Sequence, residues 1–107
     1  MSYKVIPTSQ FEKDLKRLFK KYPSVKSEIS ELILQLKENP TLGTPLLKNC
    51  YKIRMAIKSK GKGKSAGSRV ITHVRVVREE VHLLSIYDKS EQSNISDSTI
   101  NQLLKLL

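Results

Sequence analysis

The sequence predicts an α+β fold, in which a small, mainly antiparallel sheet carries a two-helix hairpin on one face and a further helix at the C-terminus. Residues 49–89 contain three apolar, β-branched runs separated by a glycine-rich loop and a short charged turn, a pattern typical of an antiparallel meander. Residues 9–38 instead place apolar side chains at helical spacing, in two stretches separated at Pro23. With 107 residues, of which 38% are hydrophobic, the chain is expected to form one domain spanning residues 1–107.

The first elements are a short strand and a helix. Residues 3–6 favour a strand that ends at Pro7, because proline cannot donate a ladder hydrogen bond. Ser9 and Glu12 have the spacing of a serine and a glutamate that cap a helix start. The apolar stripe of this helix consists of Phe11, Leu15, Leu18, Phe19 and Tyr22. Its opposite face carries Lys13, Lys16, Arg17, Lys20 and Lys21. That basic face is either a solvated surface or a contact for substrate.

A second helix is predicted after Pro23, which suits a first helical turn. Its apolar stripe consists of Val25, Ile29, Leu32, Ile33 and Leu36. Asn39 and Pro40 end the pattern, so the two helices are expected to form a hairpin over the apolar face of the sheet. Residues 41–48 are predicted to be a loop that leads into the meander.

The meander has one apolar and one basic face, because successive side chains of a strand point to opposite sides. Tyr51, Ile53, Met55 and Ile57 share the apolar side of its first strand, and Val70, Thr72, Val74 and Val76 fall together in the next. If the strands align in register, the basic sides bring together Lys52, Arg54, Arg69, His73, Arg75, Tyr87 and Lys89. This basic face is expected to be exposed and to be the working surface of the protein.

The remaining elements are a basic loop and a last helix. Residues 58–68 are predicted to be a flexible hairpin loop, with Lys58, Lys60, Lys62 and Lys64 either contacting a nucleic-acid backbone or remaining solvated. Ser96 is expected to cap a C-terminal helix, with the apolar stripe Ile100, Leu103, Leu104 and Leu107. This helix either packs on the domain or is a displaceable element near the sheet.

Charge and composition limit the class of protein. A formal charge of +10 and a pI near 9.9 favour a polyanionic partner or an acidic protein partner. A single cysteine, Cys50, excludes an internal disulfide and suits a reducing compartment. No apolar run approaches the roughly 20 residues of a membrane span, and no signal-peptide core occurs at the N-terminus. The sequence therefore predicts a soluble, cytoplasmic protein.

The candidate chemistry is that of cations with one phenol. Cys50, His73 and His82 lie on separate strands without metal-ligand spacing, and carboxylates are scarce in the meander, so no metal or cofactor is expected. A cationic cluster can still cleave RNA, because the ribose 2′-OH supplies the nucleophile. Arginines at 54, 69 or 75 would stabilise the phosphorane, and neighbouring positive charge would lower the pKa of Lys52 or Tyr87 so that one acts as base. The other possibility is a binding surface without turnover.

The order of elements, together with Cys50-Tyr51-Lys52-Ile53-Arg54 and Gly67-Ser68-Arg69-Val70, resembles the RelE/ParE superfamily of bacterial toxins. The RelE and HigB branches are the most similar. The resemblance implies a RelE-like β-α-α-β-β-β-α domain that acts as an endoribonuclease, an mRNA interferase cutting messenger RNA in the ribosomal A site without metal. It also implies inhibition by a cognate antitoxin, which is expected to cover the cations with acidic segments and to recognise operator DNA.

The resemblance also assigns residues. Lys52 and Arg54 match basic catalytic positions of the family's second strand, Arg69 matches the arginine after the loop glycine, and Lys89 matches a basic residue at the end of the last strand. Ile95 falls near the position of a RelE tyrosine, so Tyr87 is expected to substitute for it. The lysine-rich loop departs from RelE and is expected to clamp ribosomal RNA. The alternatives are a ParE-like inhibitor of DNA gyrase and a protein that binds RNA or the ribosome without cutting.

Overall fold

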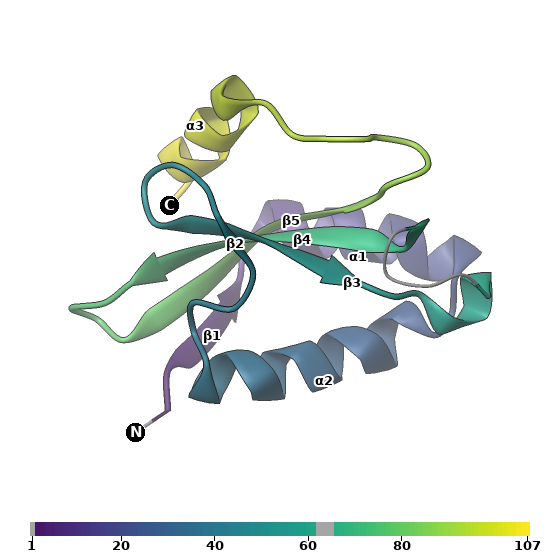
Figure 1. The fold of residues 1–107 in the computed structure, drawn as a ribbon, viewed down its shortest axis with the longest axis horizontal. Coiled ribbons are helices and arrows are strands. Elements are labelled where there is room, and N and C mark those ends of the chain that lie inside the picture. The colour runs from purple at the N-terminus through teal and green to yellow at the C-terminus, as the bar shows by residue number, and fades with distance from the viewer. Residues whose placement is uncertain (1, 62–65) are drawn as a thin grey trace.

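The computed structural model describes residues 2–61 and 66–107 and confirms the predicted α+β fold (Figure 1). In chain order the elements are β1 (Lys4–Pro7), α1 (Ser9–Lys21), α2 (Val25–Glu38), β2 (Thr44–Pro45), β3 (Cys50–Met55), the 3₁₀ turn η1 (Lys58–Lys60), β4 (Ser68–Arg75), β5 (Glu80–Asp88) and α3 (Asp97–Lys105). The five strands form one sheet in the order β1-β5-β4-β3-β2. Only β1 and β5 pair in parallel, so the sheet is mainly antiparallel, as predicted.

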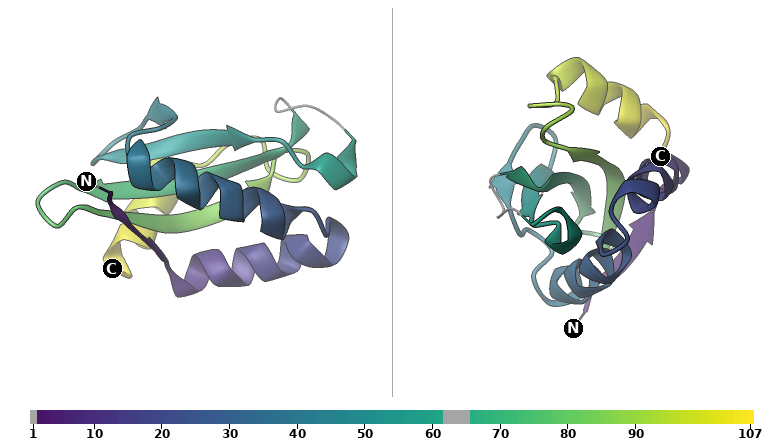
Figure 2. Two further views of the ribbon diagram at one scale, coloured as in Figure 1. Left: turned by 90° about the horizontal axis from the view of Figure 1, so that it is seen from below. Right: turned by 90° about the vertical axis from the view of Figure 1, so that its right-hand side faces the viewer.

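The helical hairpin α1–α2 covers one face of the sheet, while α3 lies on the other (Figure 2). The larger apolar cluster lies under the hairpin and contains Phe11, Leu18, Val25, Ile29, Leu32, Leu36, Ile53, Met55, Val70, Val74, Val81, Leu83 and Ile86. The predicted apolar stripes of both helices are therefore confirmed, as is the apolar parity of the meander except at Val76, which lies in the turn after β4 and is 63% exposed. This cluster is the main hydrophobic core of the described part of the chain.

A smaller apolar cluster lies under α3. It contains Cys50, Ile71, Leu84, Tyr87 and Ile100, with Leu103 and Leu104 packed against it. The C-terminal helix thus packs on the sheet, which is the first of its two predicted placements. No helix in the described ranges has both the length and the apolar composition needed to cross a membrane.

The helix starts differ from the predictions at two places. Thr8, not Ser9, caps α1: its hydroxyl accepts a hydrogen bond from the Phe11 N–H at 3.2 Å and donates one to the Leu83 carbonyl at 2.8 Å. The Thr8 hydroxyl caps the helix and also bonds to β5, so Thr8 is the N-cap residue in place of Ser9. The second helix begins at Val25 rather than in the turn at Pro23. The Ser96 cap is confirmed, because its hydroxyl accepts a hydrogen bond from the Thr99 N–H at 3.1 Å.

One strand was missed in the segment predicted to be a loop. Thr44 and Pro45 of β2 pair with Lys52 and Tyr51 of β3. A strand of two residues that contains proline has no alternating pattern to detect, and proline is tolerated there because β2 is an edge strand. Gly43 immediately precedes β2 and turns the chain onto this edge. Its φ of +106° is a conformation that favours glycine.

Candidate functional site

The predicted convergence of basic side chains occurs in one row across three strands. Arg54 of β3 is the direct partner of Arg69 of β4, and Arg69 is the direct partner of Tyr87 of β5. Lys52 lies one row further along the same face, opposite Ile71. The register needed for this part of the predicted surface is therefore confirmed.

The two arginines occupy the closest kind of cross-strand position. The Val74 N–H donates to the Asn49 carbonyl at 2.9 Å, which assigns the ladder hydrogen bonds of β3 to its odd-numbered residues. Arg54 and Arg69 therefore form a non-hydrogen-bonded pair, in which the Cα atoms lie about 4.5 Å apart. Like charges in such a pair destabilise a sheet, and an anion bound between them would relieve the repulsion.

The predicted exposure of this face is wrong for two of its members. Arg69 is only 3% exposed and Tyr87 only 4% exposed. Arg69 lies in the middle strand of the sheet, and Tyr87 shares an apolar cluster with Ile100 of α3. Arg54 is exposed, so the row runs from solvent at β3 into a covered region beside α3.

The electrostatics of the row follow from this burial. Burial and the neighbouring Arg54 charge lower the pKa of the Arg69 guanidinium below its ordinary value. Burial raises the pKa of the Tyr87 phenol, and the charge of Arg69 only partly offsets the effect. The expected lowering of the Tyr87 pKa is thus wrong in direction, because burial outweighs the nearby cation. The Tyr87 hydroxyl is buried and has no hydrogen-bond partner within the described residues.

A buried ion pair fixes the strand end next to this row. The side chain of Asp88 is fully buried, and its Oδ1 accepts hydrogen bonds from Lys60 Nζ at 2.7 Å and from the N–H and hydroxyl of Ser90 at 2.9 and 2.8 Å. Burial favours the neutral acid, but the hydrogen bonds of Lys60 and Ser90 outweigh it and bring the pKa of Asp88 to about 2. Sequence reasoning missed this aspartate, although Asp88 and Ser90 have the spacing of an aspartate that bonds the backbone two residues on.

The lysines of the predicted RNA-binding loop separate into three groups. Lys60 Nζ donates a hydrogen bond to the buried Asp88 carboxylate at 2.7 Å, so this side chain already has a partner within the protein. Lys58 is exposed, while its backbone N–H donates to the buried Glu28 carboxylate at 2.6 Å. Lys62 and Lys64 lie outside the described residues. The start of the loop is thus fixed to α2 and to the end of β5.

Lys89 lies just beyond β5. Its N–H donates to the Gly67 carbonyl at 3.0 Å, which extends the ladder one step past the pair of Ser68 and Asp88. Lys89 is partly exposed and lies two residues after Tyr87, so it is near the end of the row. A Cβ at Gly67 would clash with the Met55 carbonyl oxygen, so the glycine lets β4 start close to β3.

His73 and Arg75 share the face of the row but not its location. Arg69 and His73 lie four positions apart in β4, which is about 13 Å along the strand. His73 Nδ1 lies 3.7 Å from Cys50 Sγ, and burial, followed by the charges of Arg75 and His82, lowers the pKa of His73. Burial also raises the pKa of the Cys50 thiol to about 11, which keeps it protonated and unreactive. The structure does not bring these residues to the row.

The described residues offer no group of three or more His, Cys, Asp or Glu side chains placed to hold a metal ion. The chemistry available at the row is therefore that of two guanidinium groups, a phenol and nearby lysines. Guanidinium groups bind phosphate oxygens in planar, two-point geometry and stay protonated at neutral pH. The arrangement suits a phosphodiester or another oxyanion.

Comparison with solved structures shows the same fold. A mutant of the E. coli toxin RelE in the free state is 18% identical, with a TM-score of 0.62 over 98% of this chain and 97% of that chain. A chain of the Mycobacterium tuberculosis RelBE2 toxin–antitoxin complex is 19% identical, with a TM-score of 0.63 over 82% of this chain and 99% of that chain. A chain of the intact E. coli RelBE toxin–antitoxin complex is 19% identical, with a TM-score of 0.61 over 81% of this chain and 96% of that chain.

A sequence profile identifies the family. The profile is described as "ParE toxin of type II toxin-antitoxin system, parDE", and it matches residues 5–93, from β1 through β5. The matched range contains the Arg54–Arg69–Tyr87 row and the helical hairpin beneath it. Taken with the shared fold, this match shows that the chain belongs to the RelE/ParE superfamily of type II toxin–antitoxin toxins.

Proposed function

We propose that this toxin is a ribosome-dependent endoribonuclease that cleaves mRNA in the A site and thereby inhibits translation. The observation that carries the proposal is the row of Arg54, Arg69 and Tyr87, which aligns two guanidinium groups and one phenol on neighbouring strands. Guanidinium groups match the geometry of phosphate oxygens, so two arginines in neighbouring strands beside a phenol favour a phosphodiester substrate over a surface that only recognises protein.

The residues suggest a division of the chemical work. The 2′-oxygen attacks the adjacent phosphorus, the bond from phosphorus to the 5′-oxygen breaks, and the products are a 2′,3′-cyclic phosphate and a 5′-hydroxyl. Arg54 and Arg69 would bind the phosphate oxygens and stabilise the dianionic phosphorane. Because the raised pKa keeps Tyr87 protonated, its hydroxyl suits the role of the acid that protonates the leaving oxygen. Lys52 remains the candidate base, and Lys89 an additional phosphate contact.

The partner we propose is a cognate antitoxin. Two of the similar structures are complexes of a toxin with its antitoxin. A net charge of +10 favours an antitoxin with acidic segments, since opposite charge speeds association and fixes register. Covering Arg54 and the other exposed cations would block access of RNA to the row.

The test is a cell-free translation reaction with mRNA 5′ ends mapped by primer extension. Wild-type protein is expected to produce cuts confined to translated codons. Arg69→Met should reduce cutting about 10²–10³-fold, because it removes a cation from the transition state while keeping a side chain of similar length. The matched control is Arg78→Met, an exposed arginine in the β4–β5 turn, which should cut nearly as well as wild type. Intact mRNA with continued protein synthesis would contradict the proposal.

Inhibition of DNA gyrase is the second candidate function. It is favoured by the description of the matching profile, which names the ParE toxin. A supercoiling assay with purified gyrase distinguishes the two functions, because a nuclease of this kind leaves supercoiling unchanged. Blocked supercoiling together with intact mRNA would establish the ParE-like function, whereas intact mRNA with stalled synthesis would indicate ribosome binding without cleavage.

A further inference from the structure

The chain turns at the end of β5 around a single residue, Asp88. Its Oδ1 atom accepts hydrogen bonds from the N–H of Ser90 at 2.9 Å and from the Ser90 hydroxyl at 2.8 Å. Its backbone carbonyl accepts hydrogen bonds from the N–H groups of Glu91 and Gln92 at 3.1 and 3.0 Å. An aspartate that bonds the N–H two residues on closes a tight turn, and the residue enclosed by this turn is Lys89.

The turn fixes the backbone of Lys89 on both sides. The N–H of Lys89 donates to the Gly67 carbonyl at 3.0 Å, and the next N–H along the chain is the one bound by Asp88. None of the ion pairs among the described residues involves the Lys89 ammonium group. The turn therefore limits the directions in which this lysine side chain can extend.

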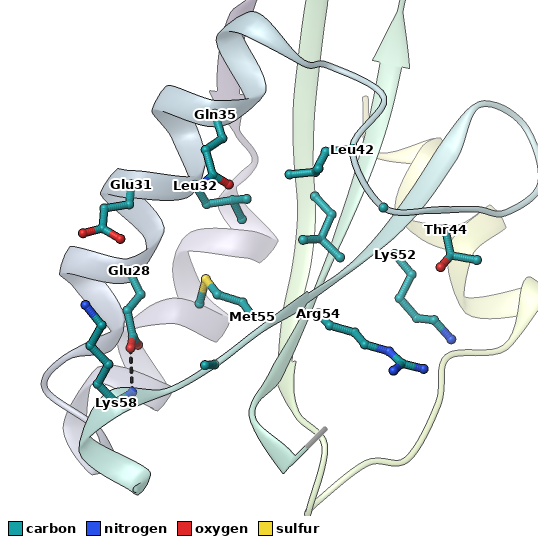
Figure 3. A pocket seen from close by; sticks show the side chains of 13 residues that line it. Glu28, Glu31, Leu32, Gln35, Leu42, Thr44, Lys52, Arg54, Met55 and Lys58 are labelled. Carbon is teal, nitrogen blue, oxygen red and sulfur yellow. Dashed lines mark hydrogen bonds between the residues drawn. The ribbon is translucent and has the colours of Figure 1, made fainter. Parts of the chain in front are cut away.

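The direction of Lys89 follows from the ladder. Lys89 lies opposite Gly67, two residues beyond Tyr87, so its side chain leaves the sheet on the same face as that of Tyr87. Arg54 directs its side chain to this face as well, away from α2 (Figure 3). Two strand residues span about 7 Å, which the four-carbon side chain of a lysine can reach across. The Lys89 ammonium group can therefore contact a phosphate bound at the row.

The carboxylate that closes the turn is compensated from the opposite face. Asp88 precedes Lys89 directly, so its side chain leaves on the side of the helical hairpin, where Lys60 Nζ donates to it at 2.7 Å. Figure 3 shows how this side is anchored: the N–H of Lys58, two residues before Lys60, donates to Glu28 of α2 at 2.6 Å. The pKa of Asp88 is about 2, so its carboxylate stays charged at neutral pH. Lys60 thereby offsets a negative charge that would otherwise weaken the binding of an anion at the row.

We propose that Asp88 is a positioning residue of the nuclease, because it closes the turn that directs Lys89 to the phosphate bound at the row. The inference rests on the proposed function and adds to the same site a residue that acts through another. It assigns separate tasks to the two properties of the Asp88 side chain. The acceptor oxygen shapes the turn through Ser90, while the negative charge pairs with Lys60 and contributes to stability.

Two substitutions test this separation in single-turnover cleavage of ribosome-bound mRNA. Asp88→Asn keeps an oxygen that accepts from the Ser90 N–H, so the cleavage rate should stay within about threefold of wild type. Asp88→Leu keeps the branched shape but removes the acceptor, and the rate should fall about 10–100-fold, with the half-saturating ribosome concentration changed less than about twofold. The matched control is Glu91→Gln, an exposed carboxylate three residues on, which should cut like wild type. Equal losses in both Asp88 variants, or full activity of Asp88→Leu, would overturn the inference.

A double variant tests whether Asp88 acts through Lys89. Lys89→Met should itself reduce the cleavage rate. Adding Asp88→Leu to it should reduce the rate less than about twofold further, because no ammonium group is left to position. A residue with a merely structural role would instead multiply the two losses, and that result would contradict the assignment.

The turn can also be tested in the wild-type protein, where no variant has to fold. Amide hydrogen exchange measured by NMR should be slower at Ser90 than at Asn94, an exposed residue of the same connection. Equal exchange at the two amides would remove the turn, and with it the inference, without reference to RNA. Intact mRNA with the wild-type protein is a different result, because it refutes the nuclease proposal and the role of Lys89 together.

Discussion

The two faces of the sheet use the same three strands for different purposes. Beneath α1 and α2, the side chains of β3, β4 and β5 are apolar and continuous with those of both helices. Beneath α3, the apolar cluster is small and ends at a row of arginines and a tyrosine. The first face provides most of the apolar burial, while the second tolerates like charges and an unpartnered phenol within the described residues. The comparison indicates that stability and function are divided between the two faces.

The largest expected effect comes from a core substitution on the first face. Phe11→Ala removes a side chain that is 1% exposed and should lower the free energy of unfolding by about 3–5 kcal/mol. Ile100→Ala, equally buried but on α3 itself, should cost less, because α3 can detach while the sheet stays folded. Urea unfolding gives the two free energies, and hydrogen exchange should show faster exchange confined to α3 in the second variant. Equal losses with uniform exchange would mean that both faces belong to one cooperative core.

A smaller effect is expected from the buried ion pair at the end of β5. Lys60→Met leaves the Asp88 carboxylate buried without its cation and should lower the free energy of unfolding by about 2–4 kcal/mol. Lys58→Met removes the same charge two residues earlier from an exposed side chain, and it should change stability by less than about 0.5 kcal/mol. Thermal and urea unfolding of both variants would check this difference. Equal stabilities would show that the Lys60–Asp88 pair contributes little.

The smallest effect is a pH dependence that belongs to the same ion pair. The pKa of Asp88 is about 2 in the folded protein, below its ordinary value of 3.8. Its contribution to stability is therefore complete above about pH 4 and is lost as the pH falls through about 2, a change of about 2 kcal/mol. Asp88→Asn should lack this part of the acid dependence. Urea unfolding of both proteins between these pH values measures it, and parallel curves would contradict the assignment.

Local sequence patterns predicted most of the fold. The apolar stripes of α1 and α2, the parity of β3 and β4, and the Ser96 cap are all confirmed, because helix and strand periodicity and capping depend on residues close together in the chain. Besides the start of α2, which lies at Val25, the misses were the two-residue strand β2 and the exact cap of α1. In both, a contact with a distant strand, β3 or β5, decided the outcome.

In the candidate site, too, some features followed from the local sequence and others depended on tertiary structure. The sequence alone determined that Lys52 and Arg54 share one side of a strand, that Arg69 begins another, and that the protein is strongly basic, since these follow from a period of two and from composition. Tertiary structure decided that Arg69 and Tyr87 are buried, that Lys60 is paired with Asp88, and that His73 lies far along the strand. Burial, pKa direction and strand-edge pairing depend on which distant segments pack together, and no local pattern encodes them.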